Sequence, residues 1–545
     1  MKYNAWAAEV RRRGEDAAAL RLEGDEKGNV VGIPAETVRA WYQSTASHDP
    51  AKWDKRHGLQ FVERAVWFNV QIAGLSWAKF NVEYFVGVDG TSIAMILLTA
   101  LISFICIFAS WENIKKHIKG YFCMFLLLET GMMGVFCALD FFLFFIFWDV
   151  MLLPMYFLIG VWGGPRKEYA AIKFFLYTFA GGVLMLLAMI AIYYGSQSTS
   201  FDPRYGQPFF KLADGSLVQH TFNLMDLAYA NSWSTASLLG MDFAKVIWVA
   251  LFIGFAIKIP MFPFHTWLPD AHVEAPTAIS VILAGILLKM GTYGIFRMNF
   301  PLFAEATKWA SGAMVVFGAI NILYGAFCAM AQKDLKKLVA YSSISHMGFC
   351  LLGMAAVTPA GMNGAMFQMF NHGCITAMLF LLVGVIYDRV HHRQIEGFGG
   401  LASKMPVYTA FTGFAFFAAM GLPGLSGFIS EALVFLGAFQ EFQLATVLSA
   451  IGIIITAAYL LWTIQRMFLG PVTDRVLAYE KEGHLHEINL REVGTLAPLA
   501  VMVIVFGFYP APVLDLFKSG MQGLTTLVAS STGIMPNVVL AAVGG

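Results

Sequence analysis

Charged residues are scarce in this sequence. Asp, Glu, Lys and Arg make up 13% of its 545 residues, against about 25% in soluble domains. Lys plus Arg number 36 and Asp plus Glu 35, so the formal net charge is +1. Because there is no excess of positive charge, we expect no nucleic-acid partner.

Cysteines and cofactor motifs are also few. The six cysteines fall in apolar segments and none forms a CxxC pair, which argues against zinc and iron–sulfur sites; they are Cys106, Cys123, Cys137, Cys328, Cys350 and Cys374. The sequence has no GxGxxG fingerprint and no P-loop. We therefore expect no metal and no cofactor in this chain, and place any NAD, flavin, haem or ATP chemistry in another chain.

Long apolar segments are what the sequence has in abundance. Hydrophobic residues make up 58% of the chain, with 49 Phe, 51 Gly and 28 Met, as in packed membrane bundles. From Thr91 onward, segments of about 20 residues or more, enough to cross ~30 Å of hydrocarbon, follow one another. The sequence predicts an all-α, polytopic membrane bundle of about twelve spans, near 91–111, 120–138, 140–162, 170–194, 242–259, 276–298, 309–331, 336–357, 362–387, 407–441, 443–468 and 494–517.

We predict three parts: a polar N-terminal arm (1–88), a transmembrane domain (89–518) and a C-terminal tail (519–545). The arm has three consecutive arginines, Arg11 to Arg13, no run of membrane length and no signal-peptide core. Short amphipathic helices, for example from Phe61 to Lys79, are one interpretation. A weakly ordered or surface-lying arm is the one we favour.

Charge in the loops predicts the orientation. One set of loops is rich in Lys and Arg, and by the positive-inside rule faces the cytoplasm; it comprises 112–119, 163–169, 332–337, 388–394 and 466–491. The alternate set, around Asp140, 357–362 and 440–444, has no Lys or Arg. Two segments on the same side do contain Lys or Arg: the 195–241 loop and the segment from Arg297 to Lys308. This orientation leaves the N-terminal arm outside.

Six ionisable residues lie at membrane depth. Each costs roughly 2.5–3.5 kcal/mol at mid-bilayer if unpaired, so a purely structural bundle has little reason to keep them. A buried, hydrated chain of proton-exchanging groups is the simplest interpretation; its members are Asp149, Lys258, Lys289, His346, His372 and Glu431.

The stretch from Phe252 to Arg297 concentrates this pattern. Lys258 precedes Pro260 by two residues, so the helix that carries it is broken, and Pro263 and Pro269 follow. Lys289 lies in the next helix, which we predict to be unbroken. A membrane tolerates broken helices and buried ammonium groups where protein or a water-filled cavity satisfies them, which indicates an ion path.

Structural roles compete with the functional one. Asp149 and Lys258 could form a helix–helix lock, and Lys258 could cap exposed carbonyl groups at the helix break. His346 and His372 could be hydrogen-bonded core histidines; the residues alone favour neither role.

Four further ionisable residues are given structural roles. We expect Lys173 to extend to the cytoplasmic face and Asp140, at a span boundary, to be solvated. His265 and His272 lie in the FHTWLPDAH segment. They could bind a metal, but no third ligand is evident, and we favour hydrogen bonds that brace the loop.

Each half of the chain has one broken helix. The first break lies at Pro260, beside Asp149, Lys258 and Lys289. The second interrupts the 407–441 segment and accompanies the two histidines and Glu431; it contains Gly421, Pro423, Gly424 and Gly427. Paired breaks in matching places are typical of inverted-repeat transporters.

Seven motifs resemble those of the antiporter-like subunits of proton-translocating NADH–quinone oxidoreductase, respiratory complex I. They are GVDGTS (87–92), FWDVMLLPMYFLIGVWGG (147–164), KFFLYT (173–178), the 257–294 block around FHTWLPDAH, AQKDLKKLVAYSSISHMGF (331–349), NHG (371–373) and LPGLSGFISE (422–431). The resemblance covers about residues 87–518. It is greatest to the subunit M type, the mitochondrial subunit 4 type.

The resemblance implies two inverted five-helix repeats and a role in proton translocation. Asp149 would be coupled to Lys258 in the first half-channel, and Lys289 would be the central lysine. His346 and His372 would form a bridge to Glu431 on the exit side. It also implies a multi-pass protein of the bacterial inner membrane, with L-type and N-type antiporter-like neighbours. NADH, FMN, iron–sulfur clusters and quinone would bind in partner subunits.

The sequence departs from the family pattern at two places, and two alternative functions remain open. The family usually has glutamate where this chain has Asp149, so the shorter side chain needs water to reach Lys258. The polar arm replaces the family's first two helices. A cation/proton antiporter subunit of the Mrp or hydrogenase-linked type, or a scaffold that pumps nothing, would carry similar motifs.

Overall fold

The computed structural model describes residues 23–24, 30–32, 59–71, 79–196, 210–214, 216–230, 233, 237–238 and 240–530. The three arginines at 11–13, most of the predicted N-terminal arm and the last 15 residues of the predicted tail lie outside these ranges.

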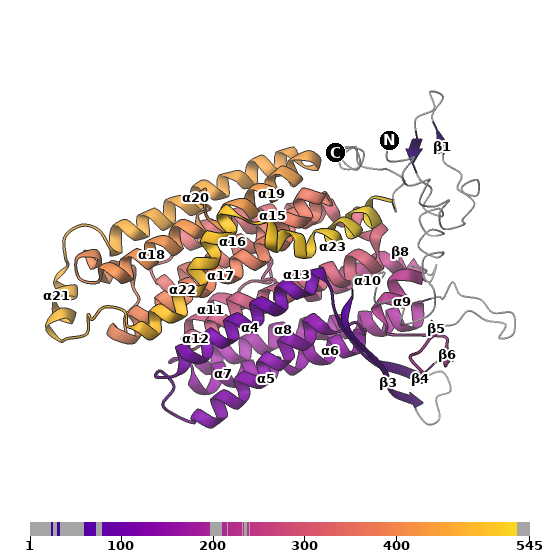
Figure 1. The fold of residues 1–545 in the computed structure, drawn as a ribbon, viewed down its shortest axis with the longest axis horizontal. Helices are drawn as coiled ribbons and strands as arrows, with labels where there is room; N and C mark the ends of the chain where they lie inside the picture. Colours follow the sequence, from indigo (N-terminus) through magenta and orange to yellow (C-terminus); the bar gives the residue numbers. More distant parts are fainter. Residues whose placement is uncertain are drawn as a thin grey trace.

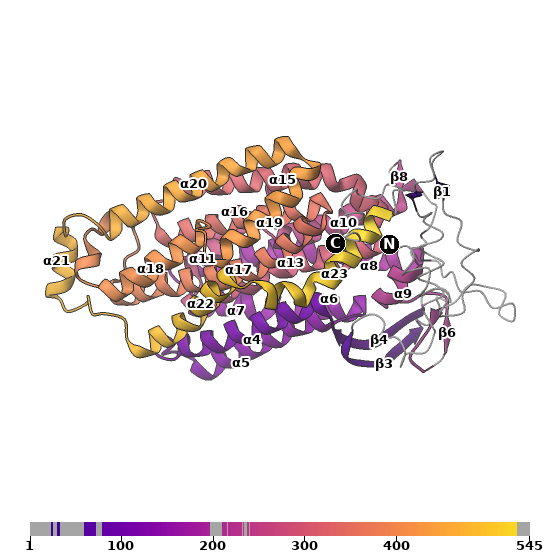
Figure 2. The same ribbon diagram turned by 45° about the horizontal axis from the view of Figure 1, so that its top comes forward.

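The described chain is a long bundle of helices that run side by side (Figures 1 and 2). The all-α membrane bundle is confirmed: ten helices in the described residues are long and apolar enough to cross a membrane. The predicted count of about twelve is not confirmed. The ten spans are α4 (Gly90–Ser110), α5 (Ile118–Cys137), α6–α7 (Phe141–Val150, Leu152–Trp162), α8 (Lys167–Gly195), α12 to α14 (Thr277–Leu302), α15 (Ala304–Met330), α16 (Leu335–Ala356), α17 (Pro359–Val390), α20 (Gln443–Met467) and α22 (Leu490–Phe508).

Shorter helices account for the difference in count. They are α10 (Phe243–Lys258), α11 (Trp267–Glu274), α18 (Pro406–Ala419) and α19 (Ser426–Glu441). As predicted, they lie on either side of one break in each half of the chain, where proline removes backbone donors and glycine lets the chain turn.

The last predicted span ends earlier than expected. Helix α22 stops at Phe508, and Pro510 precedes a separate helix, α23 (Ala511–Ser530). This helix runs through the predicted boundary between the membrane domain and the tail.

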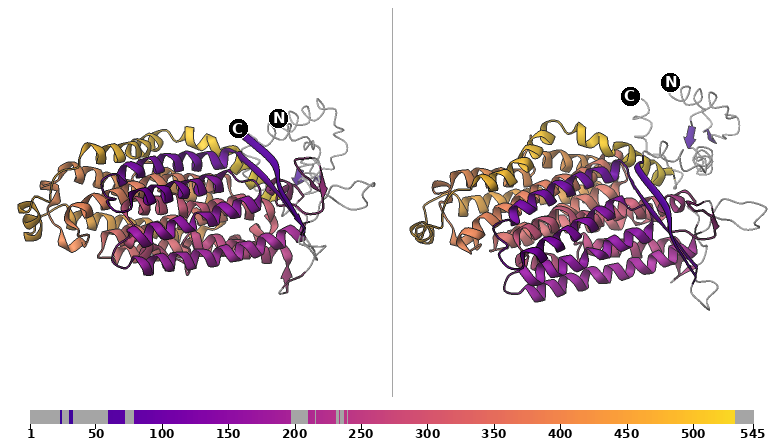
Figure 3. Two further views of the ribbon diagram at one scale, coloured as in Figure 1. Left: turned by 90° about the horizontal axis from the view of Figure 1, so that it is seen from below. Right: turned by 60° about the horizontal axis from the view of Figure 1, so that its bottom comes forward.

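A β-hairpin replaces the amphipathic helices expected around Phe61 to Lys79. Strands β3 (Gln60–Gln71) and β4 (Lys79–Val88) pair antiparallel and lie across one end of the bundle (Figure 3). Glu63, Ala65 and Trp67 are exposed and alternate with less exposed residues. That period of two is the signature of a strand, not of a helix.

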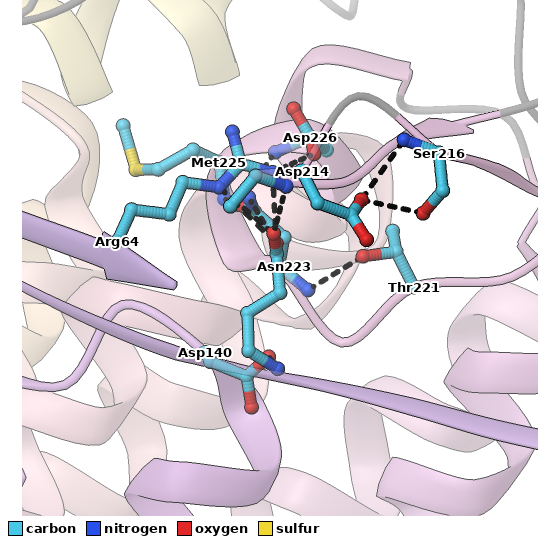
Figure 4. Close-up of polar contacts among 10 residues, drawn as sticks. Arg64, Asp140, Asp214, Ser216, Thr221, Asn223, Met225 and Asp226 are labelled. Carbon is cyan, nitrogen blue, oxygen red and sulfur yellow. Dashed lines mark hydrogen bonds and ion pairs between the residues drawn. The ribbon is translucent and has the colours of Figure 1, made fainter. Parts of the chain in front are cut away.

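The hairpin is fixed to the bundle by backbone and side-chain bonds. Leu139 N–H donates to the Phe85 carbonyl at 2.9 Å, and the Glu83 N–H donates to Asp140 Oδ2 at 3.4 Å. Buried Glu83 accepts hydrogen bonds from Arg64 at 2.8 Å and from the Ala213 N–H at 2.7 Å. Arg64 also lies 3.4 Å from Asp226, and Figure 4 shows Asn223 and Asp140 beside this group.

Asp140 is not solvated, contrary to the prediction. Its side chain is fully buried, where it caps the N-terminus of α6 by accepting from the Phe142 and Leu143 N–H groups. Burial, reinforced by the nearby Glu83 carboxylate, raises the pKa of Asp140 from 3.8 to about 7.

We expect the attachment of the hairpin to weaken as pH rises. A carboxyl whose pKa is raised in the fold binds its proton more tightly there than in the unfolded chain, so the stabilisation is lost as pH rises from 3.8 to about 7. Hydrogen exchange of the β4 amides at pH 5 and pH 8, corrected for intrinsic rates, measures this. Asp140→Asn keeps the helix cap and should abolish the difference; equal pH dependence in both proteins would contradict the assignment.

The loops rich in Lys and Arg gather at one end of the bundle, which we call the Lys/Arg-rich end. Glu112 pairs with Arg491 at 2.8 Å, Arg393 with Asp334 at 2.6 Å, and the Trp162 indole donates to the Lys116 carbonyl at 2.7 Å. The hairpin lies at the opposite end (Figure 1). Two opposed loop sets are therefore confirmed, while their assignment to sides of a membrane stays a prediction.

Arg297, an exception among the poorly charged loops, is paired. It lies near the hairpin end and donates to both carboxylate oxygens of Asp89 at 2.7 and 2.9 Å. Asp89 also caps α4 by accepting from the Thr91 and Ser92 N–H groups. One ion pair thus joins the start of α4 to the span that carries Lys289.

Candidate functional site

Asp149 and Lys258 both lie beside helix breaks. Asp149 is in the last turn of α6, which ends at Val150; α7 begins at Leu152 and contains Pro154. Proline lacks the N–H that would continue the helical bonding, which explains why the predicted 140–162 span is two helices. Lys258 is the last residue of α10 and is 1% exposed.

The Lys258 side chain faces the Trp148 ring of α6 and the sulfur of Met151, the residue that follows α6. Its Nζ lies 4.7 Å from the Trp148 ring centroid and 3.9 Å from Met151 Sδ. A cation over an indole face is stabilised electrostatically. Among the described residues, its hydrogen bonds include none to a carbonyl group, so the proposed capping role is not supported.

Asp149 and Lys258 interact without touching. The two charges are electrostatic neighbours, yet no N–O distance of 4.0 Å or less joins them in the described structure. Asp149 Oδ1 is buried without a hydrogen-bond partner and rests against Gly182 of α8, where an added Cβ would lie 3.0 Å from it. The gap fits the expectation that aspartate does not span the distance by itself.

The helix around Lys289 is unbroken, as predicted, but it is not regular. π-helical turns at Leu283–Leu287 and Ile295–Asn299 flank the segment Leu288–Gly294. Such turns are frequent at functional sites because they displace backbone carbonyls from the helical ladder. The fully buried Lys289 Nζ donates to the Ala284 carbonyl in the first of these turns.

Four of the predicted residues form a continuous series, which we call the central polar chain. Lys289 Nζ lies 2.6 Å from His372 Nδ1. The rings of His372 and His346 are 5.5 Å apart. His346 Nδ1 lies 3.4 Å from Glu431 Oε1. All four side chains are at least nine-tenths buried.

Each of the two histidines has a polar partner at only one ring nitrogen. Nε2 of His346 and Nε2 of His372 are both buried without a hydrogen-bond partner. Since buried polar atoms are normally paired, these two atoms mark positions suited to transient partners, such as water or a proton in transit. Each ring can accept a proton on one nitrogen and release one from the other.

The second helix break positions Glu431. Gly421, between α18 and α19, has a φ of +75°, and a Cβ there would lie 2.7 Å from Glu431 Oε2. Glycine is thus required at position 421 for two reasons: the positive φ favours it, and a side chain would collide with the Glu431 carboxylate. The neighbouring Ser430 hydroxyl donates to Gln368 Oε1 at 2.5 Å.

Of the structural roles predicted for the other ionisable residues, some are confirmed and one is not. Lys173 is 20% exposed and pairs at 2.7 Å with Asp270, which also lies 4.0 Å from Arg166 of the 163–169 loop, so its side chain reaches toward the Lys/Arg-rich end, as predicted. His265 Nε2 lies 3.0 Å from the Tyr324 hydroxyl, as expected of a bracing residue. His272 makes no such bond, because neither ring nitrogen has a partner. The described residues hold no group of three or more His, Cys, Asp or Glu suited to a metal.

Sequence reasoning missed Lys336. It was assigned to a charged loop, but Asp334 caps α16 two residues earlier, and the Lys336 side chain is 7% exposed. Its Nζ donates to the Ala275 carbonyl at 2.6 Å. An aspartate followed at once by an apolar helix is a start signal that could have placed Lys336 inside the bundle.

Known protein families match most of this chain. The family described as NADH:quinone oxidoreductase/Mrp antiporter, TM, matches residues 138–456, and the amino terminus of NADH-ubiquinone oxidoreductase chain 4 matches residues 53–138. NADH-quinone oxidoreductase subunit M of Rickettsia conorii is 42% identical over 465 residues, 85% of this chain and 86% of that protein.

Two further matches broaden the comparison. F(420)H(2) dehydrogenase subunit M of Methanosarcina mazei is 37% identical over 84% of this chain and 87% of its own length. A chain of respiratory complex I from Thermus thermophilus is similar in structure, with a TM-score of 0.70 and 27% identity over 91% of this chain and 94% of that one.

Proposed function

This chain belongs to the subunit M (chain 4) family of NADH-quinone oxidoreductases, and from that premise we propose how it moves protons. It is a membrane subunit that carries protons through the buried residues Asp149, Lys258, Lys289, His346, His372 and Glu431. The redox chemistry that drives them takes place in other subunits.

The central polar chain is the observation that carries the proposal. Four buried groups, spaced by 2.6 Å, by 5.5 Å between ring centroids and by 3.4 Å, offer a route in which each can accept and release a proton. Lysine suits the first position because a buried ammonium without a counter-charge gives up its proton readily. His372, in contact with Lys289 Nζ at 2.6 Å, is the acceptor, and Glu431 receives the proton from His346.

Asp149 controls when Lys258 holds its proton. While the carboxylate lies near Lys258, the ammonium is favoured; when the carboxylate moves away, burial favours the neutral amine. Because Asp149 Oδ1 has no hydrogen-bond partner, movement of this side chain breaks no hydrogen bond at that atom.

The setting follows from the family. We propose L-type and N-type antiporter-like subunits as neighbours, the bacterial inner membrane as the location, and NADH, FMN, iron–sulfur clusters and quinone as cofactors of partner subunits. The M. mazei relative is named for a different electron donor, so the donor is determined by the partner chains. Identification of the chains that co-purify with this one tests the assignment.

Exchange of Asp149 tests the mechanism. Asp149→Asn removes the charge that Lys258 needs and should lower NADH-driven proton pumping by about 10²-fold, whereas Asp149→Glu keeps the charge and should pump. The measurement is proton uptake by inverted membrane vesicles, normalised to assembled complex. The opposite order, with the asparagine variant pumping and the glutamate variant inactive, would refute the role of Asp149.

A further inference from the structure

His272 is a buried histidine outside the central polar chain. Its side chain is 0% exposed, and neither ring nitrogen has a hydrogen-bond partner. The ring stacks on Phe380 of α17 with centroids 4.4 Å apart and planes inclined by 8°, so its orientation is fixed by packing. An imidazole held rigidly with both nitrogens unbonded is costly, and no structural role in the fold accounts for that cost.

Two buried lysines flank this histidine. Lys289 and Lys336 both act on His272 electrostatically, and His272 in turn acts on His372. Lys336 Nζ bonds to the carbonyl of Ala275, three residues after His272, at 2.6 Å. His272 is thus an electrostatic neighbour of both the central polar chain and Lys336 of helix α16, and neither lysine is hydrogen-bonded to its ring.

Lys336 leads toward the Lys/Arg-rich end. Asp334, 7% exposed, caps the same helix and pairs with Arg393 at 2.6 Å. Arg393 is 21% exposed and also donates to the Val273 carbonyl at 3.2 Å. Asp388 and Glu274 complete the charged groups that face Lys336 from neighbouring elements. A series of ionisable groups thus extends from the partly exposed Arg393, through the buried Asp334, to the buried Lys336.

We propose that Lys336 and His272 form an input arm, along which protons reach Lys289 from the Lys/Arg-rich end of the bundle. The inference rests on the proposed function. Lys336, as an ammonium, gives a proton to one nitrogen of neutral His272. His272 then releases the proton from its other nitrogen to the neutral amine of Lys289, once Lys289 has passed its own proton to His372. Lys336 takes up a new proton from water at the Lys/Arg-rich end, His372 passes its proton to His346, and exchange of the ring proton with water returns His272 to its first tautomer. Each group is then in its starting state, and no oxidant or reductant is needed.

Substitution of Lys336 separates proton exchange from a structural role. Lys336→Arg keeps a cation and N–H donors for the Ala275 carbonyl, but arginine does not release its proton. The input arm therefore predicts that Lys336→Arg and Lys336→Met both pump about tenfold or more slowly in vesicles. Lys337→Met, a change of the adjacent and more exposed lysine, should pump normally. Normal pumping by Lys336→Arg would overturn the proposal, because it would leave only the carbonyl bond as the role of Lys336.

Chemical rescue tests His272 independently. His272→Ala should pump about tenfold or more slowly, and added imidazole should restore part of the rate because it can carry a proton in the vacated space. His265→Ala, in the same segment, controls for unspecific effects of imidazole and should show no rescue. If His272→Ala does not assemble, His272→Gln keeps a polar side chain without proton exchange and should show the same loss. Normal pumping by an assembled His272 variant would overturn the proposal.

Lys258→Ala in the same vesicles distinguishes failure of the input arm from failure of the proposed function. Loss of pumping in Lys258→Ala together with normal pumping in the Lys336 and His272 variants rejects the input arm alone. Normal pumping in Lys258→Ala rejects the proposed function itself.

Discussion

Replacement of Lys258 by alanine is expected to lower NADH-driven proton pumping by about 10²-fold or more, the usual contribution of a positioned proton-exchanging group. Lys258 is 1% exposed and ends a broken helix, and its Nζ faces the Trp148 ring and Met151 Sδ. Alanine offers no proton carrier in this apolar setting. The measurement is proton uptake by inverted vesicles at matched amounts of assembled complex.

A matched control comes from the same helix. Lys245 lies near the other end of α10, is 35% exposed and pairs with Asp242 at 2.7 Å. Lys245→Ala should pump normally, because an exposed ion pair contributes little. NADH oxidation with an artificial acceptor reports whether the redox module is intact. Unchanged pumping in an assembled Lys258→Ala complex would eliminate Lys258 from the mechanism.

Replacement of Arg297 by methionine should destabilise the fold by about 3–5 kcal/mol. Arg297 contacts both oxygens of Asp89, and its side chain is 9% exposed. The guanidinium holds the pKa of Asp89 well below its usual range, so the carboxylate stays charged at neutral pH. Without Arg297 that charge, in a side chain only 18% exposed, loses its ion-pair partner. Thermal unfolding of the purified complex in detergent, followed for this subunit, measures the loss.

Two variants test this explanation. Arg491→Met breaks the pair with Glu112, whose side chain is 65% exposed, and should cost about 1 kcal/mol or less. The double variant Arg297→Met/Asp89→Asn should recover part of the loss, because the orphaned charge is removed while asparagine can still cap α4. A double variant that is less stable than Arg297→Met would show that the loss has another origin.

Part of the fold could be predicted from the sequence alone. Long apolar runs predicted the membrane helices because each crosses the hydrocarbon by itself. Proline and glycine at 260 and 421–427 predicted the broken helices because they act on the backbone locally. The six site residues could be chosen because a charge within an apolar run is expensive wherever its neighbours lie.

Errors arose where packing between distant segments overrides local signals. Asp140 follows an apolar run and looks like a loop residue, but the 210–230 segment and the hairpin cover it. The hairpin itself forms against Leu139 and Phe222, residues far along the chain.

The sequence by itself determined that this is a membrane bundle with a helix break near Pro260 and another near Pro423, and with six ionisable residues at membrane depth, since these properties depend on composition and local backbone chemistry. Only the tertiary structure decided which of those residues meet. It joined Lys289 to His372, His346 and Glu431, kept Asp149 out of contact with Lys258, and placed His272 between two lysines. Helix packing sets these distances, because a rotation of one helix by a single residue would turn a side chain toward a different neighbour.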